Sequence, residues 1–201
     1  MSDFSKIDIV TIAAIVAEHL QQHGIEVVLV GGLAVEIYTH NLYLTKDIDM
    51  VNTNYQPARK LTHAMAQLDF HKQGRVYVNA STDITVEFPS APLSVGDEII
   101  KQTTVAKVGG GRIPILKAED VVKDRLAAFI HWQDRQSLIQ ATAILLQHNL
   151  KPMTFQAFCI KEGTDKDFQL LESLHTHAME HQLNTMEELE AELTQLLLNQ
   201  L

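Results

Sequence analysis

Apolar residues recur along this chain with two different spacings, and the spacing changes near residue 117. Before that point, short runs rich in Val and Ile alternate with amphipathic segments, which predicts strands joined by helices. Beyond it the spacing is helical throughout, and Pro152 and Gly163 separate the segments. The pattern therefore predicts an α/β core over residues 1–116 and a C-terminal helical subdomain over residues 117–201.

The same pattern assigns the elements of the core. We expect helices over Ser5–His23, Leu33–Thr39 and Pro57–Leu68, and strands over Glu26–Val30, Asp47–Val51, Arg75–Val78, Asp83–Phe88, Thr103–Val108 and Arg112–Leu116. Gly24 should end the first helix in the left-handed conformation. Gly109-Gly110-Gly111 predicts a hairpin turn between the last two strands, and Pro89–Glu98 should be a loop.

The C-terminal part is expected to be helical over Lys117–Trp132, Asp134–Leu150, Thr154–Lys161, Asp165–Gln182 and Thr185–Leu201. Asp134 is a candidate N-cap, and Thr185 with Glu188 forms a capping-box pattern. Leucines on one side of the last helix predict packing on the bundle, on a second copy of the chain or on a partner protein.

Composition narrows the class of protein. The 201 residues carry a net charge of −9, which argues against a broad nucleic-acid-binding surface and leaves room only for a local one, such as a groove for an RNA end. The single cysteine, Cys159, excludes an intrachain disulfide framework. No apolar run is long enough to span a membrane, and no signal peptide is evident, so we expect a soluble cytoplasmic protein.

Two carboxylates lie two residues apart in one predicted strand. Because side chains alternate between the faces of a strand, Asp47 and Asp49 should project from the same face. Neighbouring carboxylates repel each other unless a cation lies between them, and oxygen ligands suit Mg²⁺. The pair is therefore a candidate Mg²⁺ site, with a solvated strand face as the alternative.

A pair of glycines stands where the preceding strand should turn into a helix. At Gly31 and Gly32 the backbone can approach a phosphate closely, and the helix N-terminus offers free N–H groups. Alone, such a pair is a common turn. Followed by one short helix and the two aspartates, it favours a site for a metal and the phosphates that the metal binds.

These pieces, Gly31-Gly32-Leu33-Ala34 and Thr45-Lys46-Asp47-Ile48-Asp49, resemble the signature of the DNA polymerase β-type nucleotidyltransferase superfamily. The closer resemblance is to its small bacterial branches, which include toxin–antitoxin-associated transferases. It covers roughly residues 25–135. It implies a nucleotidyltransferase fold with a mixed β-sheet core, an NTP such as ATP as substrate, and two Mg²⁺ ions with NTP bound.

The resemblance also implies a third carboxylate on a later strand. Glu87 matches best, because Val86 and Phe88 flank it, and Asp83 is the fallback on the same face. Asp47, Asp49 and Glu87 are thus the implied catalytic and metal-binding residues. An exposed charge on an edge strand is the alternative for Glu87.

A basic residue on a later helix is implied to contact the triphosphate. Asp124-Arg125-Leu126-Ala127-Ala128 resembles the family segment that carries it, and Lys123 lies nearby. Arginine can grip phosphate with two hydrogen bonds, although a solvated helix cation is the alternative. The implied nucleotide-binding residues are Gly31, Gly32, Thr45, Lys123 and Arg125.

The resemblance implies transfer of a nucleoside monophosphate from NTP to a hydroxyl acceptor that the sequence does not identify. An RNA end, a protein or a small molecule would each fit. The relatives often carry an arginine shortly before the threonine, where this chain has Asn41-Leu42-Tyr43-Leu44, and often have aspartate in place of Glu87. These departures keep open a catalytically weak or inactive relative that binds a partner protein, as in toxin–antitoxin pairs.

Overall fold

The computed structural model describes residues 3–108 and 110–199. The chain forms two compact units. The sheet unit takes the N-terminal segment up to Ile37, then Leu44–Ser94 and Glu98–Lys117. The helical unit takes Tyr38–Tyr43, Val95–Asp97 and the chain from Ala118 onward.

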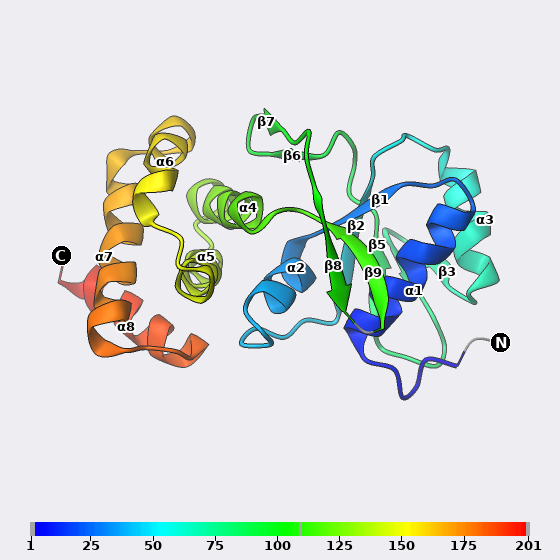
Figure 1. The fold of residues 1–201 in the computed structure, drawn as a ribbon, viewed down its shortest axis with the longest axis horizontal. Helices are drawn as coiled ribbons and strands as arrows, with labels where there is room; N and C mark the ends of the chain where they lie inside the picture. The colour runs from blue at the N-terminus through cyan, green and yellow to red at the C-terminus, as the bar shows by residue number, and fades with distance from the viewer. Residues whose placement is uncertain (1–2, 109, 200–201) are drawn as a thin grey trace. The chain divides into compact units, whose positions relative to one another are not determined.

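A mixed seven-stranded sheet forms the centre of the sheet unit, in the order β3-β4-β5-β2-β1-β9-β8 (Figure 1). Its strands are β1 (Val27–Val30), β2 (Asp47–Asn52), β3 (His71–Gln73), β4 (Val76–Val78), β5 (Thr85–Glu87), β8 (Thr104–Val108) and β9 (Gly111–Ile115). Strand β2 pairs antiparallel with β1 and parallel with β5, so the sheet is mixed, as predicted.

Helices α1 (Ile9–Gln22) and α3 (Ala58–Gln67) pack against each other, and α1 also packs on β1 and β9. The alternation of β1, β2 and β5 leaves Leu29, Ile48, Met50 and Val86 fully buried. These residues share one face by register, because Leu29 pairs with Met50 and Ile48 with Val86. These four side chains thus lie on the face opposite to that of Asp47 and Asp49.

Local side chains explain where α1 begins and ends. The Asp8 carboxylate accepts a hydrogen bond from the Thr11 backbone N–H at 2.9 Å and caps the helix at Ile9. The predicted start at Ser5 was therefore four residues too early. Gly24 follows the helix with φ +65°, the left-handed conformation predicted for it.

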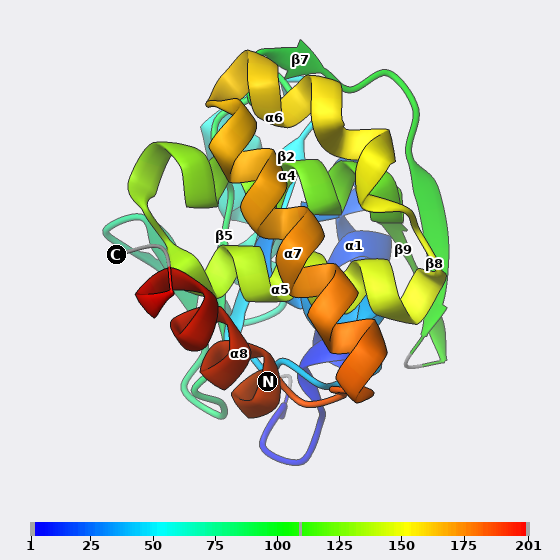
Figure 2. The same cartoon turned by 90° about the vertical axis from the view of Figure 1, so that its left-hand side faces the viewer.

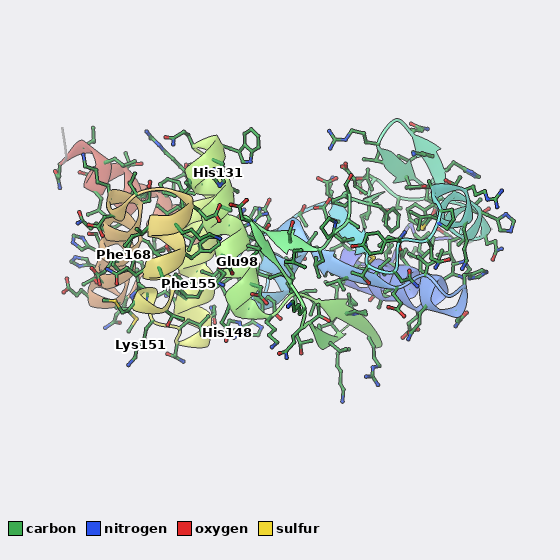
Figure 3. The ribbon with its side chains drawn as sticks, turned by 90° about the horizontal axis from the view of Figure 1, so that it is seen from above. Glu98, His131, His148, Lys151, Phe155 and Phe168 are labelled. Atoms are coloured by element: carbon green, nitrogen blue, oxygen red, sulfur yellow. The ribbon has the colours of Figure 1, made fainter. Side chains whose placement is uncertain are left out.

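The helical unit contains α4 (Ala118–Trp132), α5 (Arg135–His148), the 3₁₀ turn η1 (Pro152–Phe155), α6 (Gln156–Glu162), α7 (Asp165–His181) and α8 (Met186–Leu198). Helix α7 packs on both α5 and α8 (Figure 2). Phe155 from η1 and Phe168 from α7 are buried in this unit (Figure 3). No helix among the described residues is both long and apolar enough to cross a membrane.

Two predicted caps are confirmed in this unit. The Asp134 carboxylate accepts from the Gln136 backbone N–H at 3.1 Å, and Thr185 and Glu188 form a capping box. Helix α5 ends at His148, before the predicted Leu150, because Asn149 adopts the left-handed conformation. Of the last predicted helix, residues 200–201 lie outside the described residues.

Several short strands were not predicted from the sequence pattern. All three residues of β3 are exposed, so it carries no apolar alternation. Within the segment Pro89–Glu98, which was predicted to be a loop, Ser94–Val95 forms β6, and this pairs with β7 (Glu98–Ile99). The hairpin of β8 and β9 is confirmed, with Val108 opposite Gly111, while Gly109 lies outside the described residues.

Candidate functional site

The corner between β1 and α2 (Gly31–Tyr38) requires glycine at its first position. Gly31 has φ +65°, and a Cβ built on it would collide with Oδ2 of Asp49. Register explains the closeness, since Asp49 pairs with Val30, the residue before the corner. The carboxylate of Asp49 thus lies against the glycine backbone, in space that any side chain at residue 31 would fill.

The acids of β2 and β5 share one face of the sheet. Asp47 pairs with Thr85 and Asp49 pairs with Glu87 in the parallel ladder, and directly paired residues point to the same side. Asp47 is exposed, whereas Asp49 and Glu87 are partly buried. The fold therefore brings the three sequence-predicted acids to neighbouring positions on two adjacent strands.

Thr85 orients the more exposed aspartate. Its hydroxyl donates a 2.6 Å hydrogen bond to Oδ1 of Asp47. Thr85 was not among the predicted site residues, although the sequence carried a signal for it. It lies two residues before Glu87, and strand alternation places it on the face of the acids.

Glu87 has a cationic partner. Its Oε1 accepts from Nε of Arg75 at 3.1 Å and lies 3.1 Å from the second guanidinium nitrogen. The Arg75 side chain is 89% exposed, so this ion pair contributes little to stability. The fallback acid, Asp83, forms an exposed ion pair with Lys46, whose hydrogen bond and positive charge lower the pKa of Asp83.

A buried carboxylate organises the segment before β2. Glu36 of α2 is 4% exposed, and its Oε2 accepts the backbone N–H of Thr45 at 2.9 Å. Burial raises the pKa of Glu36, and the Thr45 hydrogen bond opposes that rise. The Thr45 hydroxyl in turn accepts the backbone N–H of Asp47 at 3.2 Å. Glu36 and Thr45 thus fix the approach to the first aspartate.

The two predicted phosphate-binding cations belong to the helical unit. Arg125 donates to Oδ2 of Asp124, at 3.0 Å from Nε and 2.5 Å from the other guanidinium nitrogen, and its remaining nitrogen lies 3.5 Å from Oε1 of Gln140. The ammonium of Lys123 lies 5.5 Å from the centre of the Phe158 ring. Both cations therefore have contacts within their own unit.

The donors on the acid face are suited to a hard cation. Carboxylate and hydroxyl oxygens of Asp47, Asp49 and Thr85 lie on one face, and the Asp49 carboxylate lies against the glycine corner. Within residues 3–108 and 110–199, no three His, Cys, Asp or Glu side chains form a group that could hold a metal ion. Mg²⁺ often has few protein ligands and keeps waters and substrate phosphates, so the aspartate pair fits it chemically.

Comparisons with known proteins agree with this arrangement. A family model described as a nucleotidyl transferase of unknown function matches residues 10–129. A search of curated protein sequences found no match. The structure is similar to the crystal structure of an antigenic nucleotidyltransferase-like protein from Paracoccidioides brasiliensis, with a TM-score of 0.55 and 16% sequence identity. The match covers 92% of this chain and 91% of that one, and at this identity it supports the fold alone.

Proposed function

Because the chain belongs to the family of nucleotidyl transferases of unknown function, we propose that it transfers a nucleoside monophosphate from an NTP to a hydroxyl acceptor. The observation that carries the proposal is the placement of Asp49 against the side-chain-free corner at Gly31, with Asp47 and Glu87 on the same sheet face. The acid that would bind the metal thus adjoins the glycine corner that would bind the phosphates.

In the proposed reaction the acceptor oxygen attacks the α-phosphorus of the NTP. The bond from that phosphorus to the bridging oxygen breaks, and pyrophosphate leaves with the electron pair. The hydroxyl proton passes to a base, for which Glu87 is the candidate because it is the carboxylate paired with Asp49. Bound Mg²⁺ would neutralise charge on the phosphate oxygens.

The residues of the chain have separate parts in this scheme. Asp47 and Asp49 would hold the metal, and Thr85 keeps Asp47 in position through its 2.6 Å hydrogen bond. Gly31 and Gly32 would admit the β- and γ-phosphates to the N-terminus of α2. Glu87 would exchange the exposed Arg75 for the metal or the acceptor, which costs little because that ion pair is solvated.

Incubation with four α-³²P-labelled NTPs, Mg²⁺ and a cell extract tests the proposal. The wild-type protein should transfer label to a component of the extract, and Asp47→Asn with Asp49→Asn should abolish transfer while the circular dichroism spectrum is unchanged. Equal labelling by the wild type and the double variant would overturn the proposal and favour a non-catalytic, partner-binding role.

A further inference from the structure

A hollow lies in the sheet unit, and the acids are not among the residues that line it. It has a volume of about 230 Å³. Val28 of β1, Tyr55 from the turn after β2, Leu93 and Ile99 from the β6–β7 region, and Lys101 and Thr103 from the following segment line it. Leu93 precedes β6 and Ile100 follows β7, and a 3.0 Å hydrogen bond from the Ile100 backbone N–H to the Leu93 carbonyl joins these two lining segments.

Val28, which lines the hollow, lies on the sheet face that carries the acids. Val28 pairs with Val51, and Val30 pairs with Asp49. Because side chains alternate along a strand, Val28, Val51 and Asp49 all point to that face. A strand rises about 3.3 Å per residue, so the Val28–Val51 pair lies about 7 Å along the sheet from Asp49. The lining of the hollow at Val28 and the acid Asp49 are thus about two residues apart along one face of the sheet.

The turn that presents Tyr55 is rigidly braced. Asn52 and Gln56 exchange two hydrogen bonds, of 2.8 Å and 3.3 Å, and the Asn54 side chain donates to the Gly24 carbonyl at 3.1 Å. Tyr55 has φ +53°, a conformation that is strained for an aromatic residue, and it is nevertheless 68% exposed. The fold therefore holds a large aromatic side chain at the edge of the hollow instead of burying it.

The lining selects a class of ligand. Lys101 is the one charged side chain among the described residues around the hollow, and Thr103 adds a hydroxyl. An exposed ring favours stacking with a flat ligand, and an ammonium favours an anion. The volume lies below the usual range for drug-sized ligands, which begins near about 300 Å³. A net charge of −9 opposes a polynucleotide.

We propose that this hollow binds the acceptor of the transfer reaction, and that the acceptor is a small phosphorylated or carboxylated molecule with a flat ring. The assignment of the ligand as acceptor rests on the proposed function. In this arrangement Tyr55 stacks on the ring, Lys101 binds the anionic group, and the acceptor hydroxyl points along the sheet toward Asp49.

Binding of 4-hydroxyphenyl phosphate, followed by ¹⁵N NMR without Mg²⁺, tests the subsite. We expect shifts at the amides of Ile99, Lys101 and Thr103, and a Kd raised about tenfold by Tyr55→Asn or Lys101→Gln. Asparagine tolerates the left-handed backbone at residue 55, so this variant should fold. Lys107→Gln on exposed β8 has the same change in charge and should bind as the wild type does. Shifts elsewhere, or an unchanged Kd in both subsite variants, would overturn the proposal.

Two further measurements separate this proposal from the proposed function. The Asp47→Asn/Asp49→Asn variant should still bind the probe, because the subsite does not include the acids. Tyr55→Asn and Lys101→Gln should lower label transfer to the extract about tenfold and leave the affinity for Mg²⁺ and a non-hydrolysable NTP unchanged. Transfer at the wild-type rate in both variants would refute the acceptor role, and loss of transfer in the aspartate variant alone would leave the nucleotidyltransferase assignment standing.

Discussion

At the scale of single residues, the site depends on a missing side chain. Gly31 is in the left-handed conformation, and the carboxylate of Asp49 fills the space that a Cβ would take. Alanine at this position would have to adopt a disfavoured backbone and also displace the acid. The first effect is conformational, and the second acts directly on the metal-binding oxygens.

Gly31→Ala should therefore abolish Mg²⁺-dependent nucleotide binding and lower the free energy of unfolding by about 1 kcal/mol. Gly110→Ala is the matched control, because Gly110 also has a positive φ, of +75°, with nothing within 4 Å of a Cβ. The control should lose similar stability, measured by urea unfolding, and keep nucleotide binding. Full nucleotide binding by Gly31→Ala would show that the position of Asp49 at the corner is unimportant.

Thr85 provides a second test at this scale. Thr85→Val keeps the shape of the side chain and removes the hydrogen bond to Asp47, so Asp47 loses its fixed orientation. The affinity for Mg²⁺ with a bound NTP analogue should fall about tenfold, as for other partners of metal ligands. The control Thr104→Val, on exposed β8, should leave the affinity for Mg²⁺ unchanged. A Thr85→Val protein with wild-type Mg²⁺ affinity would remove Thr85 from the site.

At the scale of elements, a buried carboxylate joins three segments of the helical unit. Oε2 of Glu162, at the end of α6, accepts from His131 of α4 at 3.0 Å, and its Oε1 accepts the Asp97 backbone N–H at 3.3 Å. Burial raises the pKa of Glu162, but these hydrogen bonds and the charge of Lys161 outweigh it, and the net shift is downward. A lowered pKa means that the ionised form stabilises the fold.

Ionised Glu162 should therefore stabilise the fold at neutral pH. This stabilisation should be lost as the pH falls from the usual pKa range of a glutamate down through the lowered pKa of Glu162. Glu162→Gln should lower the free energy of unfolding by about 1–2 kcal/mol at pH 7. That free energy should also fall less steeply with decreasing pH than it does in the wild type. Glu172→Gln, at an exposed position on α7, should stay within about 0.5 kcal/mol of the wild type. Urea unfolding at several pH values measures this. Parallel pH profiles for the wild type and Glu162→Gln would contradict the assignment.

Much of the element order was predictable because it depends on local chemistry. Apolar spacing placed β1, β2, β5 and the hairpin of β8 and β9, and the glycine pair marked the start of α2. Short-range signals cannot reveal β3, which has no buried residue, or β6 and β7, which are two residues each. These strands exist through pairing with distant partners.

The site shows the same division between local and distant information. Alternation alone places Asp47 and Asp49 on one face. The partners of the other groups are set by tertiary structure: Arg75 reaches Glu87 from 12 residues away, and Thr85 reaches Asp47 from 38. The roles assigned to all the predicted site residues stay predictions, and the contacts of Arg125 with Asp124 and Gln140 add a structural part for it.

At the scale of the whole molecule, the charge bears on the acceptor. The chain carries 25 acidic and 16 basic residues, a balance that repels polyanions. Fluorescence anisotropy with labelled single-stranded RNA at physiological salt should show no binding tighter than about 100 µM. Tight binding that weakens steeply with salt would indicate a basic surface, and would replace a small acceptor with a nucleic acid.

The proposed function depends on Asp47 and Asp49 binding a metal together with a nucleotide. Isothermal titration with non-hydrolysable ATP, CTP, GTP and UTP analogues, in the presence and absence of Mg²⁺, tests this most directly. We predict binding of at least one analogue that requires Mg²⁺ and is lost in Asp47→Asn/Asp49→Asn, with the unfolding midpoint in urea unchanged. Binding that is independent of Mg²⁺, or that persists in the double variant, would contradict the account.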